Sequence, residues 1–244
     1  MSMTNFIGVI TARSGSKSIT HKNLQAINGR NLLEWTSAAF DKSEKLERAV
    51  VSTDSELYAN FTRSFGVQVP FVRPAELATD QSTDSDVFRH LCDWLRNQES
   101  LPQFMVHLRP TTPFRDPEII DEAIKLFLDV HKNYSALRSV HKMSESAYKC
   151  FEIAEGNQLV RVFSREQSLD ASNNPKDSFP STFFPNGYVD IIKTEYFLDT
   201  GNIHGDAVYA FQTETALEID SEHDLEIARI MAEKNSKLYD KLFV

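Results

Sequence analysis

A regular alternation of short apolar runs with helical patterns is the feature that most constrains how this chain folds. The run from Phe6 to Ile10 carries no polar side chain, which is typical of a strand buried on both faces of a parallel sheet. Further strands are predicted at 49–51, 66–69, 104–108, 187–192, 208–211 and 216–220, and helices at 32–40, 56–65, 84–95, 116–128 and 225–238. This order predicts an α/β fold built on an open, mostly parallel sheet.

The loops at the carboxyl ends of these strands are the candidate site, because ligands of open α/β sheets bind there. A Gly/Ser loop with basic residues occupies 11–17, and Ser52 to Asp54 follows the next strand. Two prolines break the chain at 109–113, directly after another strand. From about 136 to 184 the alternation is lost, which predicts an inserted arm or a lid.

The overall charge excludes several classes of protein. The 244 residues include 26 Lys and Arg against 35 Asp and Glu, a net charge of −9, whereas binding along nucleic-acid phosphates needs a cationic surface. No apolar stretch approaches the roughly 20 residues that span a bilayer, and the first residues do not resemble a secretory signal. We therefore expect a cytoplasmic protein that binds neither nucleic acid nor membrane. Cys92 and Cys150 form neither a disulfide framework nor a metal-ligand pattern.

Charge is segregated along the chain. No acidic residue precedes Glu34, and the basic residues of that window are Arg13, Lys17, Lys22 and Arg30. No Lys or Arg occurs from 194 to 228, where acidic residues crowd together at Glu214, Glu218, Asp220, Glu222, Asp224 and Glu226. An isolated charged run is more often a solvated surface. Here, basic side chains and backbone N–H groups after the first strand suit a polyphosphate, and carboxylates near the last strand suit Mg²⁺.

This combination indicates nucleotidyl transfer, although neither the P-loop pattern nor the dinucleotide fingerprint is present. Residues 12–24, Ala-Arg-Ser-Gly-Ser-Lys-Ser-Ile-Thr-His-Lys-Asn-Leu, resemble the signature of the CMP-N-acylneuraminate synthetase (acylneuraminate cytidylyltransferase) family, which is similar to the CMP-Kdo synthetases. The resemblance continues in chain order at 51–54, 73–78, 110–113, 185–187 and 219–220.

The resemblance implies a Rossmann-like three-layer fold and a defined reaction. CMP would be transferred from CTP to the anomeric hydroxyl of a 2-keto acid sugar, typically a nine-carbon nonulosonic acid, with release of pyrophosphate. Such activated sugars serve lipopolysaccharide or capsule biosynthesis. Two alternatives stay open: an enzyme for a Kdo-type acid or another sugar, and a nucleotide-binding subunit without turnover.

The resemblance also implies roles for individual residues. It assigns nucleotide binding to Ala12, Arg13, Gly15, Ser16, Lys17, Lys22, Asn23, Arg73 and Asp84, and catalysis to Arg13, Lys22 and Asp220. The implied cofactor is Mg²⁺, held by Asp220 and by Glu218, where the family usually has a second aspartate. Asp224 is a further candidate, but a carboxylate in the first turn of a helix is favoured by the helix dipole whatever the function.

Two of the residues implied for the sugar depart from the family pattern. The residues expected to contact it are Arg109, Thr111, Lys149, Asn186 and Asp190. Sialic-acid enzymes typically have glutamine where this chain has Arg109, and often tyrosine where it has Asp190. We expect these two residues to pair with each other or to contact polar substituents of a different keto acid, because buried charges need partners. The alternative is an equivalent sialic-acid pocket with an ion pair at its rim.

The irregular stretch corresponds to the dimerisation arm of the family. The resemblance therefore implies a homodimer, with a nucleotidyltransferase domain formed by 1–139 and 185–244 and an inserted arm at 140–184. Lys149 and Lys176 match cationic positions of that arm, although lysine is most often a plain surface residue.

Overall fold

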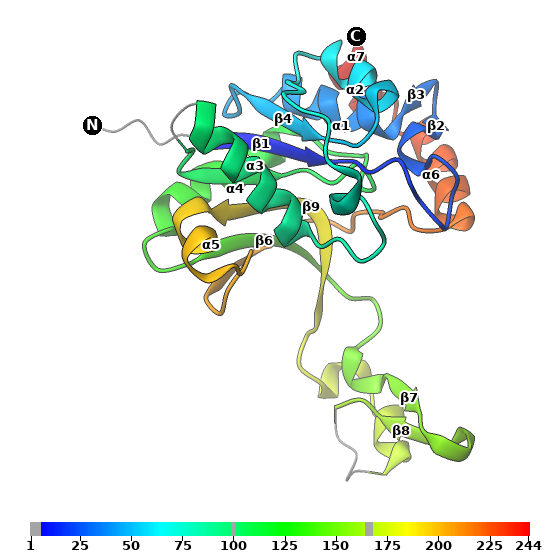
Figure 1. The fold of residues 1–244 in the computed structure, drawn as a ribbon. Coiled ribbons are helices and arrows are strands. Elements are labelled where there is room, and N and C mark those ends of the chain that lie inside the picture. Colours follow the sequence, from blue (N-terminus) through cyan, green and yellow to red (C-terminus); the bar gives the residue numbers. More distant parts are fainter. Residues whose placement is uncertain (1–5, 99–100, 164–167) are drawn as a thin grey trace.

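The computed structural model describes residues 6–98, 101–163 and 168–244. At its centre is a six-stranded sheet of order β10-β6-β9-β5-β1-β4 (Figure 1). Neighbouring strands are parallel except for β9, which is antiparallel to both β5 and β6. The predicted mostly parallel sheet is therefore confirmed. Its strands are β1 Phe6–Thr11, β4 Ala49–Ser52, β5 Phe104–His107, β6 Ala136–Lys142, β9 Phe183–Lys193 and β10 Val208–Gln212.

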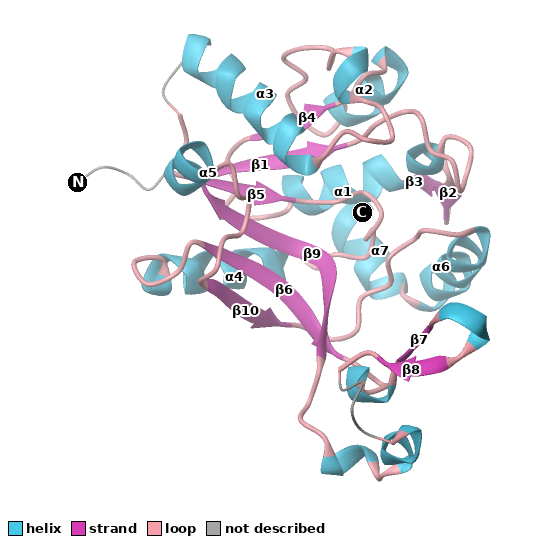
Figure 2. Ribbon diagram, turned by 60° about the horizontal axis from the view of Figure 1, so that its bottom comes forward, coloured by secondary structure: helices cyan, strands magenta, loops and turns pink. Residues whose placement is uncertain are grey.

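Helices cover both faces of the sheet and give the fold three layers (Figure 2). Side chains alternate along β1, so that Ile7 and Val9 pack against α3 and α5, while Ile10 enters the larger core on the opposite face with α1, α4 and α6. The helices are α1 Leu32–Asp41, α2 Glu56–Arg63, α3 Asp84–Gln98, α4 Pro117–Val130, α5 Thr194–Thr200, α6 Glu222–Lys234 and α7 Ser236–Phe243.

Three sequence-based predictions of secondary structure were wrong. Residues 66–69 form only the isolated bridge Val50–Gln68, and 216–220 is extended chain rather than a strand. The closing helix is two helices, because Asn235 leaves the helical conformation and its side chain accepts a hydrogen bond from the Leu238 backbone N–H. Strand β6 was missed because it reads Ala-Leu-Arg-Ser-Val-His-Lys, in which polar residues mask the apolar pattern. Its Ser139 hydroxyl accepts a hydrogen bond from the Val189 N–H of β9.

A segment at 143–182 stands away from the body of the molecule, below the sheet in Figure 1. It leaves at the end of β6 and returns into β9, and it contains the hairpin of β7 Phe151–Ile153 and β8 Leu159–Arg161. Six of its described large apolar residues are exposed: Phe151, Ile153, Leu159, Val162, Phe163 and Leu169. The predicted boundaries at 140–184 fall close to this segment. Among the described residues, no helix combines the length and apolarity needed to cross a membrane.

Candidate active site

A cavity of about 490 Å³ opens where β1, β4 and β5 end. Four stretches of chain contribute to it: the basic loop (residues 12–22), the segment from Arg73 to Val87, the loop after β5, and the acidic segment (residues 218–220). The predicted site residues that line it are Arg13, Ser16, Lys17, Lys22, Asn23, Arg73, Asp84, Arg109, Thr111, Glu218 and Asp220. The basic and acidic ends of the chain thus meet at one cavity.

The basic loop is fixed to the end of β4. The backbone N–H and the hydroxyl of Ser14 donate to the two carboxylate oxygens of Asp54 at 2.8 and 2.6 Å. Buried Asn23 donates from Nδ2 to the Arg13 carbonyl at 3.2 Å. Asn23 therefore supports the loop as well as lining the cavity. Ala12 is buried in the core, and neither Ala12 nor Gly15 lines the cavity.

Lys22 connects the basic loop to the acidic segment. It begins the short 3₁₀ turn η1 Lys22–Leu24, and its Nζ donates to the Ile219 carbonyl and to Oδ1 of Asp220, both at 2.9 Å. The Ile219 backbone N–H in turn donates to the Thr111 carbonyl at 2.8 Å. The acidic segment is therefore held in place by hydrogen bonds to Lys22 and to Thr111, without strand pairing.

The two carboxylates of the acidic segment fit a divalent cation. Burial, and then the neighbouring charge of Asp220, raise the pKa of Glu218. A cation bound by both carboxylates would remove that repulsion. Mg²⁺ commonly takes one or two carboxylates together with substrate phosphates. Within the described part of the chain, no three ligating side chains gather into a complete metal cage, so the remaining ligands would have to come from substrate and water.

Asp224 has a structural role. Its Oδ2 accepts hydrogen bonds from the backbone N–H groups of Asp220 and Ser221 and from the Ser221 hydroxyl, at 3.1, 2.8 and 2.7 Å. Ser221 and Asp224 form the capping box of α6. These hydrogen bonds, that from the Ser221 hydroxyl first, lower the pKa of Asp224. Asp224 does not line the cavity, and it fixes the backbone that carries Asp220.

Arg73 brings an unsatisfied guanidinium to the cavity. The residue is 4% exposed, and neither Nε nor Nη2 has a hydrogen-bond partner among the described residues. Its backbone N–H donates to the Thr53 carbonyl at 2.7 Å, which fixes its place beside β4. Burial lowers the pKa of Arg73, and nearby Arg13 adds to that effect. A buried arginine without acceptors at a cavity wall indicates that a ligand supplies them.

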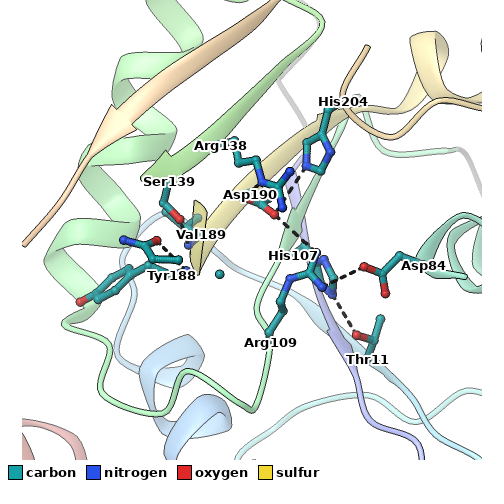
Figure 3. A network of polar contacts seen from close by, with 12 residues as sticks. Thr11, Asp84, His107, Arg109, Arg138, Ser139, Tyr188, Val189, Asp190 and His204 are labelled. Carbon is teal, nitrogen blue, oxygen red and sulfur yellow. Dashed lines mark hydrogen bonds and ion pairs between the residues drawn. The ribbon is translucent and has the colours of Figure 1, made fainter. Parts of the chain in front are cut away.

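Arg109 lies between two carboxylates at one end of the cavity (Figure 3). Its Nη1 is 2.9 Å from Oδ2 of Asp84, and its Nη2 is 3.7 Å from Oδ2 of Asp190. Arg109 and Asp190 are therefore within ion-pair distance, although neither carboxylate oxygen of Asp190 accepts a hydrogen bond from the described residues. Asp190 is 2% exposed, and two further basic groups face it, Arg138 Nε at 3.9 Å and His204 Nε2 at 3.5 Å.

The strand order explains how this polar cluster forms. Asp190 on β9 is opposite His107 of β5 on one side and Arg138 of β6 on the other. Burial by itself would raise the pKa of Asp190, but His204, His107 and Arg109 outweigh it and the pKa is lowered. Burial also lowers the pKa of His107, to about 4, so this imidazole is neutral at pH 7. It shares a hydrogen bond of 2.9 Å with the Thr11 hydroxyl (Figure 3).

Arg115, which the sequence analysis did not single out, holds the loop that carries Arg109. It is completely buried, and its Nη2 donates to the carbonyls of Arg109 and Gly187 at 2.6 and 2.7 Å. Its Nε donates to the Tyr188 carbonyl. Gly187 of β9 has φ +63°, and a Cβ there would lie 3.1 Å from the Thr112 hydroxyl, so the backbone conformation and the close approach of β9 to the loop after β5 favour glycine.

Three residues predicted to contact the sugar do not line the cavity: Asp190, whose buried carboxylate faces Arg109, and Asn186 and Lys149. Asn186 is buried behind the cavity wall, where its Nδ2 donates to the Thr213 hydroxyl at 2.8 Å and its carbonyl accepts from Thr112. Lys149 lies in the projecting segment, with Nζ 5.8 Å from the centre of the Phe179 ring. Neither lines the cavity of its own chain.

Comparison with known proteins gives a consistent result. The profile of a family described as cytidylyltransferase matches residues 7–241. The chain is 31% identical over 241 residues to an N-acylneuraminate cytidylyltransferase of Escherichia coli O18:K1:H7, covering 96% of this chain and 54% of that protein. It thus spans about half the length of that relative. It is 33% identical over 174 residues to a CMP-N,N'-diacetyllegionaminic acid synthase of Legionella pneumophila, covering 69% and 72%.

A third relative matches over its full length. The chain is 26% identical over 244 residues to post-translational flagellin modification protein B of Campylobacter coli, covering 98% of this chain and 100% of that one. Among solved structures, CMP:2-keto-3-deoxy-manno-octonic acid synthetase complexed with CTP superposes with a TM-score of 0.66 at 14% identity, covering 94% and 99%. That likeness shows a shared fold.

Proposed function

The chain belongs to the cytidylyltransferase family, and from this premise we propose that it transfers CMP from CTP to a nonulosonic, sialic-acid-like keto acid. The anomeric oxygen of the sugar attacks the α-phosphorus of CTP, the bond to the β-phosphate oxygen breaks, and pyrophosphate leaves. The observation that carries the proposal is the single cavity that Arg13, Lys17 and Lys22 line together with Glu218 and Asp220.

The basic side chains supply the electrostatic part of the mechanism. Negative charge spreads over the α-phosphate and the departing pyrophosphate in the transition state, and cations fixed in the cavity stabilise it. Arg13 and Lys22 both line the cavity, where they would orient the triphosphate toward the acceptor. The unpartnered donors of Arg73 suit acceptor atoms of the nucleotide.

Glu218 and Asp220 would hold Mg²⁺ together with the phosphates of CTP. The ion, when bound, neutralises phosphate charge and polarises the α-phosphate. Lys22 keeps Asp220 in place through its contact at 2.9 Å.

A pyrophosphate-release assay tests the reaction. CTP is compared with GTP, ATP and UTP, each with Mg²⁺ and with sialic, legionaminic, pseudaminic or Kdo acid as acceptor. We expect release only with CTP and a nonulosonic acid. Release with Kdo alone would favour the Kdo-type alternative, and CTP binding without product under every acceptor would favour a non-catalytic subunit.

The polar cluster around Arg109 is our candidate for sugar selectivity. Arg109 lines the cavity and is held by Asp84 and Asp190, so its guanidinium offers charge-assisted hydrogen bonds to carboxylate or hydroxyl groups of the acceptor. Arg109→Gln should change the ranking of keto acids by kcat/KM. Arg138→Gln is the matched control, because Arg138 also faces Asp190 but does not line the cavity. Unchanged selectivity in Arg109→Gln would eliminate this role.

We also infer a homodimer in which the arm at 140–184 packs on a second copy. The exposed side chains of Phe151, Ile153 and Phe163 give the arm an apolar surface that its own chain leaves open to solvent. In such a dimer Lys149 would reach the partner's cavity. Light scattering should report a dimer for the wild type and a monomer for Ile153→Lys. A monomeric wild type would contradict this arrangement.

A further inference from the structure

Asp80 forms ion pairs with two of the basic side chains that the proposed function assigns to the triphosphate. Its Oδ1 is 3.0 Å from Arg13 Nη1, and its Oδ2 is 2.6 Å from Lys17 Nζ. Both basic residues line the cavity, and so does Asp80 itself. One carboxylate therefore bridges two cations at the mouth of the site.

The bridging carboxylate is carried by a strap, residues 75–83, which lines the cavity between the turn η2 Ala75–Leu77 and the start of α3. The Thr79 carbonyl accepts a second hydrogen bond from Arg13 Nη1, at 2.7 Å. Ser82 closes the turn, since its hydroxyl accepts from the Thr79 N–H at 3.0 Å and donates to the Glu76 carbonyl at 3.2 Å. The strap thus presents Asp80 directly to Arg13 and Lys17.

The strength of these contacts is suited to reversible displacement. The side chains of Asp80, Arg13 and Lys17 are 42%, 37% and 79% exposed, and exposed ion pairs are individually weak. Hydrogen bonding from Lys17 is the main cause that lowers the pKa of Asp80, so this carboxylate is ionised at neutral pH. A polyphosphate brings several negative charges to the same two cations and outcompetes a single carboxylate.

We propose that Asp80 is a built-in competitor for the polyphosphate site: it holds Arg13 and Lys17 in the free enzyme, gives them up to CTP, and takes them back as pyrophosphate leaves. This inference rests on the proposed function, because it assigns these cations to the phosphates. Its consequence is that the site binds pyrophosphate more weakly than its basic residues alone would allow, which limits product inhibition.

The test is to remove the charge of Asp80 and measure polyphosphate binding to the full chain by calorimetry at fixed Mg²⁺. Asp80→Asn should bind inorganic pyrophosphate and CTP about three- to tenfold more tightly, as expected for two exposed ion pairs that no longer compete. The inhibition constant for pyrophosphate should fall by the same factor, while kcat does not increase.

Glu76→Gln is the matched control. It removes one negative charge from the same strap, but Glu76 makes no ion pair with Arg13 or Lys17 in the described structure. We expect less than about a twofold change in pyrophosphate affinity. In a Lys17→Met background the effect of Asp80→Asn should shrink, since one of the two competing contacts is already gone.

Three results would overturn the inference: equal pyrophosphate affinity in Asp80→Asn and wild type, weaker affinity in Asp80→Asn, or the same gain in Glu76→Gln. A wild type that binds pyrophosphate but forms no CMP-sugar would disprove the proposed function instead. In that case the calorimetric comparison would still decide whether Asp80 competes for the site.

Discussion

Lys22 Nζ lies 2.9 Å from Asp220 Oδ1, although the two residues are 198 positions apart in the chain. The contact joins the first βα loop to the segment before α6, and both residues line the same cavity. A cation provided by the protein and a carboxylate suited to a metal ion therefore share one end of the site.

Substitutions at this contact should distinguish the role of Lys22 as a cation from the role of Asp220 as a metal ligand. Lys22→Met removes a charge that stabilises the transition state, so turnover should fall by at least about 100-fold. Asp220→Asn should instead raise the Mg²⁺ concentration needed for half-maximal pyrophosphate release. Glu226→Gln serves as the control, because it removes one carboxylate from the exposed surface of α6 at a residue that does not line the cavity. The same Mg²⁺ dependence in wild type and Asp220→Asn would contradict the metal assignment.

Arg73 should increase the affinity for CTP without increasing the stability of the folded protein. Its Nε and Nη2 are buried without hydrogen-bond partners, and burial outweighs the attraction of Asp54, so Arg73→Met removes two unsatisfied donors and should leave the free energy of unfolding unchanged or higher. The same variant should weaken CTP binding about 10- to 100-fold, through lost charge-assisted hydrogen bonds. Urea unfolding and calorimetry measure the two effects. Arg96→Met, which removes a surface charge from α3, should change neither, and normal CTP binding by Arg73→Met would refute the role.

His107 should make the protein less stable in mild acid. Its pKa is about 4 in the folded protein and 6.5 ordinarily, so between these values the unfolded chain binds more protons. The free energy of unfolding therefore rises with pH through this window, and about 3 kcal/mol is lost on acidification from pH 6.5 to 4.

The groups that face His107 are Thr11, Phe88, Arg109, Asp84 and Asp190. The lowered pKa values of Asp84 and Asp190 affect the free energy of unfolding in more acidic solution, where those carboxylates become protonated. Urea midpoints from pH 4 to 7 should be flatter in His107→Gln than in wild type. An equally steep dependence in the variant would assign the effect to other groups.

Arg115 should be the most sensitive position of the loop after β5. Arg115→Met leaves the buried carbonyls of Arg109, Gly187 and Tyr188 without a donor, so we expect a loss of about 3–5 kcal/mol in the free energy of unfolding. In Arg115→Lys, which retains the charge but not the forked geometry, KM for the sugar should rise more than KM for CTP. Proportional changes in both constants would argue against a role in placing Arg109.

Much of the site follows from two features of the sequence. Parallel strands bring their carboxyl ends to one edge, and charge segregation marks Arg13 and Lys22 at one end of the chain and Asp220 at the other. The family resemblance added Arg73 and Arg109. None of this required the acidic segment to be a strand, and it is held instead by the contact between Ile219 and Thr111.

Other features depend on long-range contacts that local patterns do not encode. Arg115 reads as an exposed charge after a proline, yet it is completely buried because three carbonyls converge on it. Asp80 is indistinguishable in sequence from other surface acids until the strap brings it to Lys17. The polar residues of β6 are compatible with a place inside the sheet because Arg138 faces Asp190 on the neighbouring strand β9.

Lys142, the last residue of β6, pairs with Phe183, the first residue of β9, so the projecting segment begins and ends at one residue pair of the sheet. The residues between them form an insertion that connects the antiparallel strands β6 and β9. Insertions, deletions or wholesale exchange of that segment leave the register of β9 unchanged, and with it the position of Asp190. The length and sequence of the projecting segment can therefore vary without moving the strand that carries Asp190.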